Sequence, residues 1–201
     1  FGGQWPLTLT QIDATYKGFP GHISPVELSC VGQQGWSLLE GHLSLPLAVL
    51  KQTALDHNLE WMQRFCKSKN LDIAPHGKTT MSPELYKMQI DAGAWGISFA
   101  TVFQAGLGIR NHVKRIIIAN QVFQASDLDA LSHLLETHSD VSVFFLVDSL
   151  AQLKQIEAWR ASSSSQQAFT VLIELGINGK RTGCRDHATA MQLAREIKAT
   201  Q

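Results

Sequence analysis

The sequence predicts an α/β fold with a parallel sheet, and within that class an incomplete (β/α)8 TIM-type barrel. Short apolar runs alternate with amphipathic stretches, as in repeated β/α units. The runs start 20 to 28 residues apart, at positions 47, 71, 95, 115, 141 and 169. Runs that are apolar throughout indicate strands buried on both faces, as in a parallel sheet. An open doubly wound sheet fits the same order, but its dinucleotide-binding form has G-x-G-x-x-G after the first strand, and residues 51–56 contain no glycine. The barrel is therefore favoured.

Each apolar run is expected to form a strand: 47–50, 71–74, 95–100, 115–119, 141–147 and 169–175. A helix should follow each strand, and helical spacing places Leu55, Leu59, Met62 and Cys66 on one face of the first. Helices are also expected near 102–110 and 186–199. Four residues are expected to cap helix N-termini: Thr53, Ser82, Ser126 and Ser149.

The composition is that of an ordinary soluble globular protein. Of 201 residues, 17 are Lys or Arg and 17 are Asp or Glu, so no net charge is left to hold nucleic acid or an anionic membrane surface. No apolar run approaches the roughly 20 residues of a membrane-spanning helix. The three cysteines, Cys30, Cys66 and Cys184, form no C-x-x-C pair. They indicate inert thiols in a reducing compartment and predict a cytoplasmic location.

Two regions are predicted along the chain. Residues 1–45 are rich in glycine and proline and form a lead-in segment, and residues 46–201 form a partial barrel of about six β/α units. A whole barrel takes roughly 250 residues. Two missing units would leave sheet edges exposed, so we expect the complete polypeptide to be longer.

Polar residues that follow the predicted strands are the candidates for chemistry, because parallel α/β folds place their active sites at the carboxyl ends of strands. Lys78 follows the second strand in the string Pro75-His76-Gly77-Lys78-Thr79-Thr80. At a barrel mouth its ammonium would be partly desolvated, which frees the amine to attack an aldehyde. An ordinary solvated surface lysine explains the position equally well.

Four further residues lie at the same ends of strands. His76 precedes Lys78 by two residues, so both point to one side of a strand, where His76 is either a ligand contact or a satisfied core histidine. Arg181 lies in a turn bracketed by glycines and either reaches an anionic oxygen or is an exposed loop arginine. Asn120 is either a turn former or a cofactor contact, and Asp148 is interpreted as a helix cap.

Taken together, these strings resemble the bacterial D-amino-acid deaminases, which are similar to D-serine dehydratase and D-threonine aldolase within the alanine-racemase-like (fold type III) pyridoxal-phosphate enzymes. The resemblance runs from about residue 36 to the end of the chain. It is most specific at residues 74–80, and it continues through Ala92-Gly93-Ala94-Trp95-Gly96-Ile97, Ala100-Thr101 and Ile118-Ala119-Asn120-Gln121. Dehydratase and aldolase relatives often have Lys-Thr-His-Lys where this chain has Lys-Thr-Thr-Met at residues 78–81, which fits the deaminase branch.

The resemblance implies that Lys78 binds pyridoxal 5'-phosphate as a Schiff base and is the catalytic residue. It places His76 beside that lysine, Arg181 at the cofactor's phenolic oxygen and Asn120 among the cofactor-binding residues. It also implies a C-terminal β-domain and a homodimer for the complete protein. A divalent metal such as zinc would be bound by residues outside this chain.

The expected reaction is deamination of a D-amino acid such as D-serine to a keto acid and ammonia. Alternatives with the same fold are a D-threonine aldolase, an amino-acid racemase and a non-catalytic pyridoxal-phosphate carrier, and a barrel without cofactor also stays open. A small D-amino acid is the expected partner, and neither nucleic acid nor a membrane is.

Overall fold

A computed structural model describes residues 10–165 and 167–200. The chain divides between Leu55 and Asp56 into two compact units, which we describe separately. In the first unit, strand β1 (Gln11–Ile12) pairs antiparallel with β2 (Val26–Glu27), and the 3-10 helix η1 (Leu28–Gln33) follows. The predicted division into a lead-in of residues 1–45 and a barrel segment of residues 46–201 stays a prediction.

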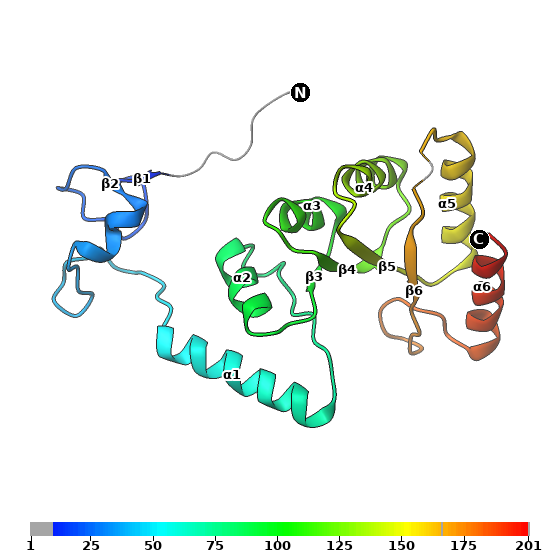
Figure 1. The fold of residues 1–201 in the computed structure, drawn as a ribbon, viewed down its shortest axis with the longest axis horizontal. Coiled ribbons are helices and arrows are strands. Elements are labelled where there is room, and N and C mark those ends of the chain that lie inside the picture. The colour runs from blue at the N-terminus through cyan, green and yellow to red at the C-terminus, as the bar shows by residue number, and fades with distance from the viewer. Residues whose placement is uncertain (1–9, 166, 201) are drawn as a thin grey trace. The chain divides into compact units, whose positions relative to one another are not determined.

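The second unit contains a four-stranded parallel sheet with the order β3-β4-β5-β6 (Figure 1). Its strands are β3 (Ile97–Phe99), β4 (Arg115–Gln121), β5 (Ser142–Val147) and β6 (Thr170–Ile173). The helices are α1 (Gln52–Lys69), which begins just before the division, α2 (Pro83–Asp91), α3 (Val102–Arg110), α4 (Ala125–Thr137), α5 (Leu150–Ser162) and α6 (His187–Ala199). Strands that neighbour one another in sequential order confirm the predicted β/α repeat and part of a TIM-type barrel.

The first two predicted strands are not formed as expected. Residues 47–50 are in no strand, and Val49 and Leu50 are exposed; among the described residues, no strand pairs with them. Residues 71–77 do run parallel to β3, because Trp95 N donates to Ile73 O and Gly77 N donates to Ser98 O, both at 2.8 Å. The nitrogen of Pro75 has no hydrogen to donate, which interrupts the ladder and leaves this segment an irregular edge.

Two of the four predicted helix caps are confirmed. The hydroxyl of Ser82 accepts from Leu85 N at 3.4 Å, and that of Ser149 accepts from Gln152 N at 3.2 Å. Thr53 is wrong as a cap, because α1 begins one residue earlier. Ser126 is wrong because it lies inside α4, whose N-terminal cap, Gln124, makes no side-chain capping bond.

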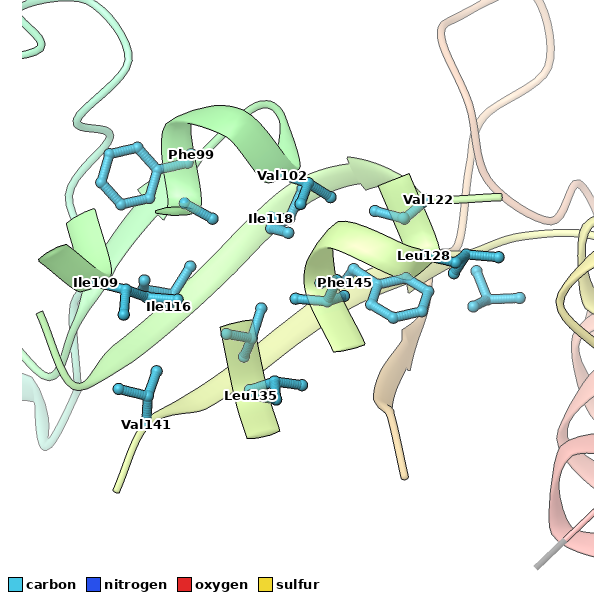
Figure 2. Close-up of a cluster of buried hydrophobic side chains, with 14 of the residues drawn as sticks. Phe99, Val102, Ile109, Ile116, Ile118, Val122, Leu128, Leu135, Val141 and Phe145 are labelled. Carbon is cyan, nitrogen blue, oxygen red and sulfur yellow. The ribbon is translucent and has the colours of Figure 1, made fainter. Parts of the chain in front are cut away.

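The core lies between one face of the sheet and helices α3, α4, α5 and α6. Figure 2 shows Ile116, Ile118 and Phe145 from the strands meeting Leu128 and Leu135 from α4. These five side chains are buried. Because all four strands pair in parallel, their carboxyl ends meet at one edge of the sheet.

The opposite face of the sheet is less well covered than the sequence predicts. Its side chains alternate with those of the core, as they must in strands. Ile117, Phe144 and Leu146 are only partly buried, and Leu172 is 39% exposed. This second face ends, at the carboxyl edge, in the polar residues of the candidate site. No described helix is both long and apolar enough to span a membrane.

Candidate active site

Lys78 leaves the carboxyl end of the edge segment from a backbone that is tightly held. Gly77 is buried, and its carbonyl accepts from the hydroxyl of Tyr86 at 3.1 Å and from Met81 N at 3.0 Å. A β-carbon on Gly77 would lie 2.8 Å from the rings of Tyr86 and Phe99, so only glycine fits there. Lys78 itself is exposed. Its expected desolvation is therefore not present, although the position at the end of a strand-like segment is as predicted.

His76 is not the core histidine that the sequence allowed. Its side chain is exposed, and Nδ1 lies 3.0 Å from the backbone oxygen of Ser98. That contact joins the ring to strand β3 and limits how it turns. A fixed, exposed imidazole two residues before a lysine is suited to contact a ligand held by that lysine.

Asn120 lies inside β4 and is not in a turn. Its amide donates to Ala100 O at 3.3 Å, and its side-chain oxygen accepts from Gln121 N at 3.1 Å. The register of β4 on β5 shifts between Ile118 and Gln121, so an extra length of chain bulges at this edge. The bulge brings Asn120 over the end of β3, the strand nearest to the Lys78 segment.

A polar cluster at the ends of β4, β5 and β6 was largely missed in the sequence. The amide nitrogen of Gln121 donates to a carboxylate oxygen of Glu174 at 2.6 Å and of Asp148 at 3.2 Å. In the sequence, Glu174 falls within the apolar run 169–175, and the position of Asp148 predicts a helix cap, a role that Ser149 takes instead. One feature of the sequence could have indicated both residues. Asp148 lies two residues after Leu146, and Glu174 lies two residues after Leu172, so each carboxylate is on the same face of the sheet as the leucine before it.

Arg181 lies in the loop after β6, which is closed at its base. Leu175 and Cys184 form a parallel bridge, and Gly176 N donates to Cys184 O at 2.8 Å. Asp148 accepts from Gly183 N at 2.8 Å, which attaches the loop to the end of β5. Arg181 is exposed, which agrees with the predicted possibility of an exposed loop arginine.

Cys184 lies at the base of this loop and is 4% exposed. Burial, with the charge of Asp148 as a second cause, raises the pKa of the Cys184 thiol. We expect iodoacetamide at about pH 8 to label Cys184 in the native protein more slowly than the half-exposed Cys30, because only the thiolate reacts. The rate at Cys184 should rise only at higher pH. Peptide mass analysis measures both rates, and in urea they should become equal.

All four candidate residues lie at the carboxyl edge of one sheet, but the sheet does not bring them all together. Asn120 contacts the end of β3 beside the segment that carries His76 and Lys78. Arg181 follows β6, and strands β3, β4 and β5 lie between that strand and the Lys78 segment. In a barrel the same strands curve around a common mouth, which a ligand can span.

The set of donors fits pyridoxal phosphate. An exposed amine at Lys78 suits the cofactor's aldehyde, and the guanidinium of Arg181 suits its anionic phenolic oxygen. No group of three or more His, Cys, Asp or Glu side chains in the described part of the chain is arranged to hold a metal ion.

A parallel sheet with helices packed on one face and polar side chains at its carboxyl edge is the arrangement found in a segment of a TIM-type barrel. Residues 50–201 match the family model described as alanine racemase, N-terminal domain. The chain therefore belongs to the alanine racemase N-terminal domain family, whose enzymes use pyridoxal phosphate.

Several known proteins similar to this chain have names that include a D-amino acid as the substrate. 3-Hydroxy-D-aspartate aldolase of Paracoccus denitrificans is 23% identical over 161 residues, which are 80% of this chain and 41% of that protein. The structure of D-threonine aldolase from Filomicrobium marinum has a TM-score of 0.69 at 25% identity, covering 78% of this chain and 41% of that one. For D-threo-3-hydroxyaspartate dehydratase from Delftia sp. HT23 the TM-score is 0.62 at 28% identity, with 70% and 36% covered.

A structure of a mutant D-threo-3-hydroxyaspartate dehydratase, also similar to this chain, is of the metal-free form. The chain spans about two fifths of the length of these relatives.

Proposed function

We propose that this chain is part of a pyridoxal-phosphate-dependent lyase that acts on D-amino acids, and that its reaction is the deamination of a substrate such as D-serine. One observation carries the proposal. Lys78 is exposed at the carboxyl edge of a partial barrel, on a backbone held by Tyr86 and β3. Relatives named as D-amino-acid aldolases and a dehydratase support the substrate class.

Each candidate residue has a distinct proposed role. When bound, pyridoxal phosphate supplies an aldehyde carbon and an electron-withdrawing ring that stabilises negative charge on a substrate's Cα. Lys78 would hold the cofactor through Nζ, and the free Nζ amine would accept the proton from Cα of the substrate. Arg181 donates to the phenolic oxygen. His76, whose ring is held against β3 by its contact with Ser98 O, would contact the cofactor ring, and Asn120 would be a further cofactor contact.

Three further features belong to the proposal for the complete protein: a divalent metal such as zinc held by residues outside this chain, a homodimer and a cytoplasmic location. The metal is supported by the relative described in a metal-free form. In deamination of D-serine the β-hydroxyl leaves, and a metal that coordinates this oxygen would assist its departure.

An assay of products tests the reaction. We expect the complete protein with pyridoxal phosphate to release ammonia and a keto acid in equal amounts from D-serine, and neither from L-serine. An ammonia electrode or a coupled enzyme measures the ammonia, and enzymatic reduction of the keto acid measures the keto acid. Release of ammonia from the L isomer at the same rate would contradict the stereochemical part of the proposal.

D-Threonine aldolase activity is the second candidate, because two of the three relatives described above are aldolases. Glycine and an aldehyde from D-threonine, without ammonia, would replace deamination with this activity. Interconversion of D- and L-isomers without other products would identify a racemase. Absence of turnover with all these substrates, together with a bound cofactor, would identify a carrier protein.

A further inference from the structure

Arg185 makes an unusual set of contacts with the loop that carries Arg181. Its two terminal nitrogens donate to four backbone carbonyls of this loop. Nη1 donates to Ile177 O at 2.6 Å and to Thr182 O at 3.4 Å. Nη2 donates to Lys180 O at 3.4 Å and also to the carbonyl of Arg181. One guanidinium therefore links both sides of the loop, including the residue proposed to contact the cofactor.

Apolar burial does not hold this loop in place. Residues 177–182 are all exposed, and Ile177 is 72% exposed. The loop's base is held by Gly176 N donating to Cys184 O and by Gly183 N donating to Asp148, both at 2.8 Å. Within the tip, a turn closes where Lys180 N donates to Ile177 O at 3.0 Å. The carbonyls at the tip are therefore held mainly by Arg185.

The space around the guanidinium is shaped for it. A β-carbon on Gly176 would lie 2.6 Å from Nη1 of Arg185 and closer still to the backbone oxygen of Thr182, so a larger residue there would displace both the guanidinium and the loop backbone that it holds. The planar fork of an arginine presents several fixed N–H groups, whereas a lysine presents one ammonium on a flexible stem. A lysine would keep the charge but could not hold four carbonyls in the same arrangement.

We propose that Arg185 is a positioning residue for the cofactor. It fixes the backbone of Arg181, so that the guanidinium of Arg181 stays at the cofactor's phenolic oxygen. This inference rests on the proposed function of Arg181, and it adds a residue that has no cofactor contact of its own. Loss of Arg185 should therefore act on the bound cofactor only through Arg181.

The first test compares cofactor-free forms of the complete protein. In Arg185→Lys, we expect amide hydrogens of residues 177–182 to exchange faster, while those of β4 and β5 exchange as in the unaltered protein. Arg195→Lys on α6 is the matched control, since Arg195 is an exposed arginine outside the loop. Equal exchange of the loop amides in Arg185→Lys and in the unaltered protein would overturn the proposal.

The second test titrates the visible absorption band of the cofactor bound to lysine. A nearby cation disfavours protonation of the cofactor–lysine nitrogen, so losing the Arg181 contact should move the pH midpoint of the band upward. We expect this shift in Arg181→Met and also in Arg185→Lys, which keeps the charge at position 185. We also expect about tenfold weaker binding of added pyridoxal phosphate in Arg185→Lys, the change that loss of a charge-assisted hydrogen bond produces.

A double variant separates positioning from a direct effect. If Arg185 acts through Arg181, adding Arg185→Lys to Arg181→Met should cause no further shift of the midpoint. Arg185→Met removes all the N–H donors at this position and should shift the midpoint in the same direction, which provides a second variant if Arg185→Lys folds poorly. An additive double variant, or unaltered midpoints in both Arg185→Lys and Arg185→Met, would overturn the inference. A failure of the proposed roles of Lys78 and Arg181 would give a different result. In that case the unaltered protein would form no visible band, or Arg181→Met would leave the pH midpoint of the band unchanged.

Discussion

Replacing Lys78 with alanine in the complete protein should abolish the covalent bond to pyridoxal phosphate and lower turnover at least about a thousandfold. The residue is exposed at the end of the edge segment, and its amine is the proposed nucleophile and base. Borohydride treatment of the unaltered protein should add the reduced cofactor to the peptide that contains Lys78. The same peptide from Lys78→Ala should carry no such mass, and the visible absorption band should be absent.

Lys87 provides a matched control on the neighbouring helix. It is also exposed and pairs with Asp91 at 2.5 Å, an i,i+4 surface pair that contributes little to stability. Lys87→Ala should therefore keep the band, the labelled peptide and the turnover. A labelled lysine other than Lys78, or a band that persists in Lys78→Ala, would remove Lys78 from its proposed role.

The sequence predicts β3 to β6 well because each is a local apolar run flanked by turn residues and a helix. The run at residues 47–50 has the same composition, yet it forms no strand, since a strand also needs a neighbour for its backbone groups. Helix caps show the same limit on a smaller scale. Ser82 and Ser149 lie next to helix starts and are found, whereas Thr53 and Ser126 fail because each helix begins one residue before the predicted cap.

The candidate site is predicted only in part, for a different reason. Lys78 and Arg181 stand out because residue type, glycine neighbours and position after a strand coincide in local strings. The contacts among Gln121, Asp148 and Glu174 join three strands and depend on a register shift in β4 that no local string reveals. Nothing in the sequence distinguishes Arg185 from other exposed arginines, because its role comes from the fold of the loop around it.

The burial that holds this edge of the sheet in place should make Phe99→Ala strongly destabilising. Phe99 is fully buried in β3, and its ring meets Tyr86 edge-on with centroids 5.4 Å apart. Helix α3 approaches so closely that a β-carbon on Gly108 would lie 2.6 Å from the ring. Truncation leaves a cavity between these elements, and we expect the free energy of unfolding of the complete protein to fall by about 3–5 kcal/mol. Urea denaturation of the cofactor-free protein measures it.

Phe103 on α3 tests whether burial, rather than loss of an aromatic ring, causes that change. It lies four residues from Phe99 and is 74% exposed, so Phe103→Ala should change the free energy of unfolding by no more than about 0.5 kcal/mol. Because Phe99 and Tyr86 also pack around Gly77, Phe99→Ala should in addition loosen the backbone before Lys78 and weaken cofactor binding. A loss of stability below about 1 kcal/mol in Phe99→Ala would show that β3 does not support this edge of the sheet.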